Sequence, residues 1–148
     1  MTTLRFYNTL SNSKEDFVPL QPNRANLYTC GPTVHDYAHI GNFRAYVFED
    51  LLRRTLKYFG YKVYQVMNLT DVEDKTIRKS RELGLSLSDY TRTFKEAFFQ
   101  DLESLRMERA EVYPAATDHV PEMVDLVRKL MEKGYTYYAD ASIYFRIS

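Results

Sequence analysis

The sequence has one cysteine, no tryptophan and no excess of charge of either sign. A lone cysteine cannot form an internal disulfide, and the amino-terminal region lacks the basic and apolar segments of a secretion signal. We therefore expect a reduced, cytoplasmic protein. Because 20 Lys and Arg balance 20 Asp and Glu, no global positive field is available to hold nucleic acid. The absence of a long apolar run argues against a membrane span.

Proline and glycine are also sparse, with five of each scattered along the chain and not gathered in a linker. No repeat or low-complexity segment is present, so the 148 residues favour one continuous globular segment. Hydrophobic residues make up 45% and charged residues 27%, which is typical of a folded domain and excludes a disordered chain. Tyr and Phe are abundant, and we assign most of them to the core.

Apolar spacing in the first half predicts a strand, a helix and a second strand. This order of elements forms a right-handed unit with parallel strands, so we expect an α/β sheet. The Gly31-Pro32 pair ends the buried strand in this interpretation, and Gly60 ends the helix. The predicted segments are a strand over 4–7, a surface loop over 8–16, a buried strand over 26–30, a helix over 40–59 and a strand over 62–67.

The second half predicts three helices and two short strands. Thr70 and Glu73 have the spacing of a capping box, and Pro121 falls in the first turn of the last helix. That helix is expected to turn Val124, Val127, Leu130 and Met131 inward. The predicted segments are helices over 70–83, from 88 onward and from 119 to 133, and strands over 135–138 and 143–147.

A polar loop over 30–44 follows the buried strand and opens the long helix. Ligands of open α/β sheets bind at this place, beyond the carboxyl ends of the strands. A helix N-terminus presents free N–H groups to phosphate, and Gly41 lets a ligand approach the backbone closely. His39 can donate a hydrogen bond to a phosphoryl oxygen, although a helix cap with a buried imidazole explains the same pattern.

Other polar residues are interpreted on the sequence alone. We expect Cys30 to be a buried structural thiol, because no Cys or His partner accompanies it at metal-ligand spacing. Asp71, Glu73 and Asp74 form an acidic cluster that is either a metal site or a solvated first turn of a helix, which the helix dipole favours.

Several stretches of the chain resemble the cysteinyl-tRNA synthetases. The resemblance is carried by CGPTVHDYAHIGNFRAY after one strand and NLTDVEDK after the next, and it runs from FYNTL through AATDHVPEM to IYFRIS. The tetrapeptide His39-Ile40-Gly41-Asn42 is similar to the HIGH signature of class I aminoacyl-tRNA synthetases, with Asn in place of the last His. The resemblance implies an α/β, Rossmann-like nucleotide-binding fold of the HIGH superfamily, of which the chain holds the first half with its parallel sheet.

The resemblance also implies how the chain is divided. Residues from 1 to about 110 are expected to form the first half of the nucleotide-binding fold, and residues from about 111 to 148 the start of a connective insertion with a short β-hairpin. The half with the KMSKS motif and the anticodon-binding domain are absent. Because the chain stops within a β pattern, we expect a piece of a longer enzyme.

Roles follow from the resemblance residue by residue. Cys30 is implied as a zinc ligand whose partner ligands lie outside this chain, in a site that also takes the thiolate of the substrate cysteine. The other implied roles are cysteine binding by Gly31 and Thr70, ATP binding by Pro32, Thr33, His39, Gly41 and Asn42, catalysis by His39 and Asn42, a basic family motif at Lys75, Thr76, Ile77 and Arg78, and a His119 that borders the pocket or only satisfies backbone groups.

The implied reaction has two steps. ATP with Mg²⁺ activates L-cysteine to cysteinyl-adenylate, and tRNA(Cys) then accepts the cysteinyl group. We expect a monomer that makes no membrane contact, and we expect this chain alone to be inactive and to bind no stoichiometric zinc. The alternatives are a cysteine ligase of mycothiol synthesis, which tends to have Pro at the positions of Val34 and Lys75, and a non-catalytic binding fragment of the same fold.

Overall fold

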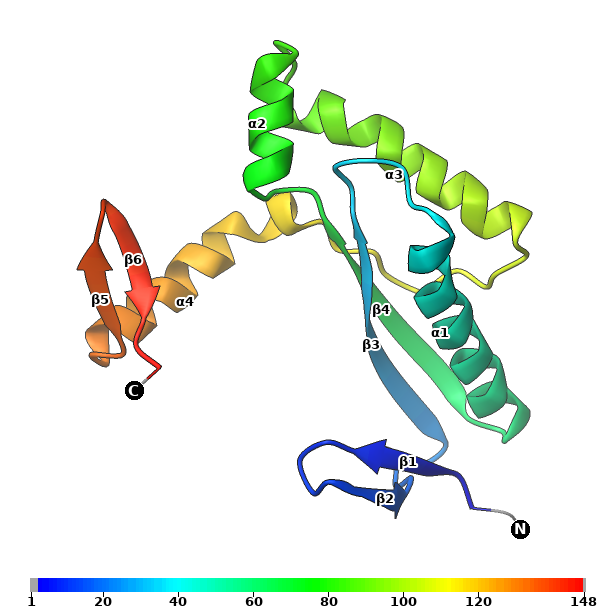
Figure 1. Ribbon diagram of the computed structural model, residues 1–148. Coiled ribbons are helices and arrows are strands. Elements are labelled where there is room, and N and C mark those ends of the chain that lie inside the picture. The colour runs from blue at the N-terminus through cyan, green and yellow to red at the C-terminus, as the bar shows by residue number, and fades with distance from the viewer. Residues whose placement is uncertain (1–2, 148) are drawn as a thin grey trace.

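In the computed structural model, which describes residues 3–147, two parallel strands lie against two long helices (Figure 1). Strand β3 (Arg24–Thr33) leads to helix α1 (Ile40–Tyr58) and strand β4 (Lys62–Thr70), and helix α3 (Leu87–Ser104) lies on the same side of the sheet as α1. β3 and β4 pair in parallel along their length. The predicted strand–helix–strand unit and the α/β fold class are therefore confirmed.

Helix α1 begins and ends close to where the sequence predicts. The residues that it buries include Phe43, Tyr46 and Leu56, which recur at helical spacing on one face. After the C-cap residue Phe59, Gly60 has a φ of +88°, a left-handed conformation that glycine adopts without strain. The chain can therefore turn sharply into β4.

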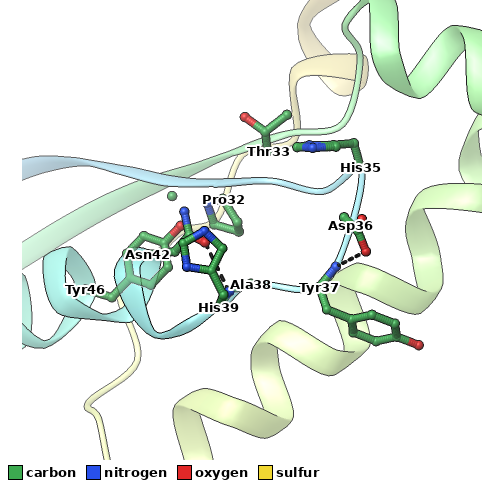
Figure 2. A pocket seen from close by; sticks show the side chains of 10 residues that line it. Pro32, Thr33, His35, Asp36, Tyr37, Ala38, His39, Asn42 and Tyr46 are labelled. Atoms are coloured by element: carbon green, nitrogen blue, oxygen red, sulfur yellow. Dashed lines mark hydrogen bonds between the residues drawn. The ribbon is translucent and has the colours of Figure 1, made fainter.

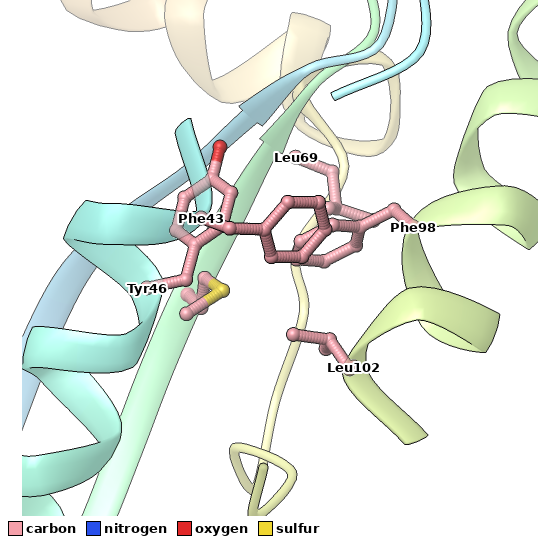
Figure 3. Packing of buried hydrophobic residues seen from close by; sticks show 6 residues of the cluster. Phe43, Tyr46, Leu69, Phe98 and Leu102 are labelled. Atoms are coloured by element: carbon pink, nitrogen blue, oxygen red, sulfur yellow. The ribbon is translucent and has the colours of Figure 1, made fainter. Parts of the chain in front are cut away.

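The hydrophobic core lies between β4, α1 and α3 (Figure 3). The Phe98 ring stacks on Phe43 at 6.3 Å between ring centroids and meets Tyr46 edge-on at 5.4 Å. Helix α3 thus packs beside α1 on the same face of the sheet and leaves the other face open. The buried cluster consists of Phe43, Tyr46, Met67, Leu69, Phe98 and Leu102.

A strand-like segment over 111–115 borders the second edge of β4. The Met67 N–H donates to the Val112 carbonyl at 3.0 Å, and the Leu69 N–H donates to the Pro114 carbonyl at 2.8 Å. The sequence did not predict this segment, because it is short and contains a proline.

Arg53 of α1 fastens this segment to the helix. Its guanidinium donates to both carboxylate oxygens of Glu111, at 2.7 and 2.9 Å, and to Glu108 at 2.9 Å. The Gln65 N–H also donates to Glu111, at 2.6 Å. The hydrogen bonds from Arg53 lower the pKa of Glu111 to about 2, against the opposing effect of burial.

A hairpin of β1 (Arg5–Asn8) and β2 (Ser13–Asp16) lies near the start of β3 (Figure 1). The strand predicted over 4–7 is confirmed, shifted by one residue. The loop predicted over 8–16 is wrong in its second half, where four exposed polar residues form β2. Backbone pairing with β1 stabilises this strand. Its sequence therefore lacks the apolar alternation from which a strand could be predicted.

Strand β3 is longer and more open than predicted. It continues through Gly31 and Pro32 to Thr33, with a shift in its pairing after Cys30, and only Ala25 and Pro32 of the strand are buried. Among the strands that the structure describes, β3 pairs only with β4, so its other edge is uncovered. A proline is tolerated at such an edge irregularity, because its missing N–H needs no ladder partner.

Helix α2 (Asp74–Glu82) begins four residues later than predicted. Glu73 is its N-cap, with a capping box closed by the Thr76 hydroxyl, and Thr70 is the last residue of β4. The predicted cap at Thr70 is therefore wrong. The predicted end is confirmed by Gly84, which has a φ of +65° just after the C-cap Leu83.

The last elements are η1 (Ala116–His119), α4 (Val120–Glu132), β5 (Thr136–Ala139) and β6 (Ser142–Phe145). The helix and the hairpin are confirmed, but no residue of α4, all of which the structure describes, is buried. Val124, Val127 and Met131 were expected to face inward and are 42%, 37% and 47% exposed, because α4 extends away from the sheet (Figure 1). Leu130 is partly buried.

None of the helices within residues 3–147 is long and apolar enough to cross a membrane.

Candidate nucleotide and amino-acid site

A cavity of about 380 Å³ opens where β3 ends and α1 begins (Figure 2). This is the place where ligands bind in open α/β sheets, as the sequence predicted. Of the predicted site residues, the structure brings Gly31, Pro32, Thr33, His39 and Asn42 to it. The full lining is Gly31, Pro32, Thr33, His35, Asp36, Tyr37, Ala38, His39, Asn42 and Tyr46.

His39 and Asn42 cap the start of α1 by a reciprocal pair of hydrogen bonds, of which Figure 2 marks the one between these two residues. The Gly41 N–H donates to His39 Nδ1 at 3.0 Å, and the His39 N–H donates to Asn42 Oδ1 at 3.1 Å. Because Nδ1 accepts a hydrogen bond, the neutral imidazole carries its proton on Nε2. The cap thus sets the tautomer that presents an N–H donor to a ligand.

Gly41 is required by this cap. A Cβ at Gly41 would lie 2.7 Å from Cε1 of the His39 ring, so any larger residue would displace the imidazole. Gly41 does not line the cavity itself; it borders a shallow hollow on the exposed face of α1 together with Arg44 and Phe48. The structure therefore gives Gly41 a role through His39.

The loop between β3 and α1 is held from several sides. Tyr90 of α3 donates from its hydroxyl to the His35 carbonyl at 2.6 Å. Asp36 lies 3.7 Å from the ammonium of Lys79, and the Tyr37 N–H, with Lys79, lowers the pKa of Asp36. His35, for which no role is predicted, lines the cavity, with Nδ1 3.7 Å from a Glu73 carboxylate oxygen.

Tyr46 closes the inner side of the cavity. Burial raises the pKa of its hydroxyl to about 12, and the nearby Glu49 carboxylate adds to the effect. The phenol therefore stays neutral at physiological pH and can donate a hydrogen bond.

A second group of predicted residues lies on the sheet. Cys30 is exposed and pairs in register with Asn68, and side chains of parallel partners lie on the same face. Gln65, Met67 and Leu69 are the buried residues of β4, so the alternating residues Asn68 and Thr70 face away from the core. Cys30, Asn68 and Thr70 thus share the open face of the sheet. The prediction of a buried Cys30 is wrong, because that face is uncovered.

Gly31 lies in the irregular part of the β3–β4 pairing, against the backbone of Asn68. A Cβ at this position would lie 2.0 Å from the Asn68 carbonyl oxygen, so only glycine fits. Its N–H donates to the Asn68 side-chain oxygen at 3.4 Å. Thr70, opposite Thr33 in the sheet, is not among the residues that line the cavity.

Asp71 is a buried residue that holds three elements together, a role that the sequence does not predict. It is 2% exposed and accepts hydrogen bonds from the Lys95 ammonium at 2.6 Å and from both the N–H and the hydroxyl of Thr117, at 2.9 and 2.6 Å. Burial alone would raise the pKa of Asp71, but these hydrogen bonds outweigh it and the pKa is lowered. Asp71 therefore joins the end of β4 to α3 and η1, which neither interpretation of the acidic cluster predicted.

The remaining predicted residues do not line the cavity. Lys75 and Arg78 are exposed on α2, Ile77 is partly buried, and Thr76 is fully buried as part of the helix cap. The side chain of His119 is 50% exposed, and its Nδ1 lies 3.7 Å from Glu122. The basic motif is thus divided between surface charge and helix capping.

The described part of the chain does not supply a complete metal site. Residues 3–147 contain no group of three or more His, Cys, Asp or Glu side chains placed to hold an ion. Zinc takes four ligands in structural sites and three protein ligands in catalytic ones. Cys30 can contribute only one thiolate, so these residues do not by themselves fit a zinc ion.

Comparison with solved structures identifies the class of fold. The chain superposes on LeuRS of Agrobacterium radiobacter, solved in a ternary complex with tRNA and LeuAMS, with a TM-score of 0.68 over 81% of this chain and 16% of that chain, at 21% identity. At that identity the match establishes the fold alone, an α/β fold shared with part of LeuRS.

Sequence comparison identifies the family within that class. The family model for tRNA synthetases class I (C) catalytic domain matches residues 16–148, and the chain belongs to this family. It is 55% identical over 148 residues to a cysteine–tRNA ligase of Brachyspira hyodysenteriae, and 53% identical over 146 residues to that of Protochlamydia amoebophila. These matches cover 100% and 98% of this chain but only 31% and 30% of the relatives' length.

Proposed function

We propose that the chain supplies the first part of a cysteine–tRNA ligase catalytic domain. The carrying observation is the reciprocal His39–Asn42 cap, which faces a cavity at the end of β3 and presents a donor there. In this proposal residues 1 to about 110 form the first half of the nucleotide-binding fold, and residues from about 111 to 148 begin the connective insertion.

The proposed reaction begins at the α-phosphate of ATP. The cysteine carboxylate oxygen attacks phosphorus, the bond to the β-phosphate breaks, and pyrophosphate leaves with Mg²⁺. Negative charge grows on the phosphoryl oxygens, and His39 donates from Nε2–H to one of them. Asn42 uses its side-chain oxygen in the helix cap, so its amide nitrogen keeps two N–H donors for phosphate. Pro32, Thr33 and the start of α1 bound the ATP side of the cavity.

The amino-acid side of the site is proposed at the neighbouring strand ends. Gly31 and Thr70 contact cysteine, and Cys30 lies beside Asn68 on the same open face. Cys30 would contribute one thiolate to a zinc ion that favours a thiol ligand over a hydroxyl, with the other ligands supplied from outside these residues. The second step, transfer to tRNA(Cys), and a monomeric, cytoplasmic enzyme complete the proposal.

The proposal is tested in a chimera, in which this chain replaces the matching 148-residue stretch of the Brachyspira hyodysenteriae relative. We expect cysteine-dependent exchange of pyrophosphate into ATP. His39→Ala is expected to lower this exchange about a hundredfold or more, because a preorganised donor to the transition state is lost. Asn26→Ala, an exposed position at the far end of β3, is the control and leaves exchange unchanged.

An inactive chimera that folds, or a His39→Ala chimera with full activity, would contradict the proposal. The acceptor in the second step separates the proposal from a mycothiol-type ligase, since charging of tRNA(Cys) supports the former and cysteinylation of an amino sugar the latter.

A further inference from the structure

Asn68 lies between the two residues to which we assign cysteine binding, although it has no assigned role of its own. Its side-chain oxygen accepts from the Gly31 N–H on β3 at 3.4 Å, and its side-chain nitrogen donates to the Thr70 hydroxyl on β4 at 3.1 Å. One amide group therefore bridges the carboxyl ends of both strands.

The partners fix which way this amide points. A backbone N–H can only donate, so the Asn68 oxygen must face Gly31 and its nitrogen must face Thr70. The Thr70 oxygen thereby receives a hydrogen bond, and its own proton points elsewhere. Thr70 is partly buried on the open face of the sheet, beside Asn68 and Cys30. The hydroxyl is thus set as a donor toward that face.

We propose that Asn68 is a positioning residue for the cysteine substrate. It holds the Thr70 hydroxyl as a hydrogen-bond donor, and the bond that it accepts from the Gly31 N–H orients its amide for this role. A Cβ at Gly31 would lie 2.0 Å from the carbonyl oxygen of the same Asn68, so the backbones of these two residues are in direct contact and leave no space for a side chain. This inference rests on the proposed function, because it assumes that Gly31 and Thr70 contact cysteine.

The test uses substitutions that keep side-chain volume and remove hydrogen bonds. Asn68→Leu removes both bridges with little change in size, and Thr70→Val removes the hydroxyl alone. Asn26→Leu is the matched control, since Asn26 lies on the same strand face as Cys30 near the other end of β3. Each variant, and the Asn68→Leu/Thr70→Val double variant, is measured in the chimera by pyrophosphate exchange at varied cysteine and ATP.

We expect Asn68→Leu and Thr70→Val each to raise the KM for cysteine about tenfold, while the KM for ATP and the melting temperature stay near those of the parent. If Asn68 acts through Thr70, the double variant resembles Thr70→Val alone. A merely structural Asn68 would instead change both KM values and the melting temperature together.

The inference is overturned if Asn68→Leu leaves the KM for cysteine within about twofold of the parent, or if Thr70→Val does so. It is equally overturned if the two effects multiply to about a hundredfold in the double variant, because the residues then act independently. A parent chimera without exchange activity contradicts the proposed function instead. The exchange activity of the parent chimera is therefore measured before that of any variant.

Discussion

The part of the molecule that carries the candidate site and the part that follows it differ in packing. Strand β4 and helices α1 and α3 share one core, in which Phe98 and Leu102 are 2% and 1% exposed. In the described part of the chain after η1, no residue of α4, β5 or β6 is buried, and Leu126 and Tyr138 are 57% and 72% exposed. The candidate site therefore rests on a packed frame, whereas α4 and the hairpin depend on local interactions.

The largest expected effect is a difference in unfolding free energy between a substitution in the core and one on α4. Phe98→Ala is expected to cost about 3–5 kcal/mol of unfolding free energy, because it empties the centre of the core. Leu126→Ala on α4 is expected to cost less than about 0.5 kcal/mol. Urea unfolding of the 148-residue chain measures both values, and similar costs would show that the two regions are equally packed.

A smaller effect is expected at the ion-pair network behind the core. Arg53→Met leaves Glu111 without its ion-pair partner and Glu108 with Lys57 alone, at a cost of about 2 kcal/mol, since both carboxylates keep some contact with water. Arg54→Met is the matched control, and we expect a clearly smaller loss because the Arg54 side chain, which pairs with Asp50 and donates to the Arg106 carbonyl, is largely exposed. Equal effects in urea unfolding would refute a special role for Arg53.

The smallest expected effect is on the pH dependence of stability. The pKa of Glu111 is about 2 in the folded chain and near its usual value of 4.5 when unfolded. Its contribution is therefore complete above about pH 4.5 and is lost as the pH falls toward 2. Between pH 5 and pH 3 we expect the parent to lose about 1 kcal/mol more than Glu111→Gln.

The control for this pH series is Glu132→Gln, at the exposed end of α4. Unfolding free energies at pH 7, 5 and 3 should give the parent and this control the same slope. A Glu111→Gln variant with the slope of the parent would show that the Arg53–Glu111 pair does not govern acid stability.

Much of the frame could be predicted from the sequence, because local signals specify it. The spacing of Phe43 and Tyr46, followed by Gly60, marks α1 and its end, and β4 follows as a run of β-formers. The predictions that were wrong concern residues whose structure depends on contacts distant in the sequence or on the uncovered face and edge of the sheet. Strand β3 passes through Gly31 and Pro32, which would stop an interior strand but are tolerated where pairing is irregular.

The residue types of the candidate site could be predicted from the sequence, but the hydrogen bonds that hold these residues in place could not. The sequence placed His39 and Asn42 at a helix start, but the reciprocal cap that orients them needs coordinates. Asp71 meets partners 24 and 46 residues further along the chain, so no local pattern shows the anchor. Whether Cys30, Thr70 and His119 have their proposed roles stays a prediction, because none of the three lines the cavity.

Cysteine activation is tested most directly by pyrophosphate exchange in the chimera with cysteine or serine as the only amino acid. We predict exchange with cysteine at least about a hundredfold faster than with serine, because one substrate carries a thiol and the other a hydroxyl. Loss of the cysteine signal in His39→Ala would connect that activity to the cavity beside α1. Equal exchange with both amino acids, or none with cysteine in a folded chimera, would contradict the proposed function.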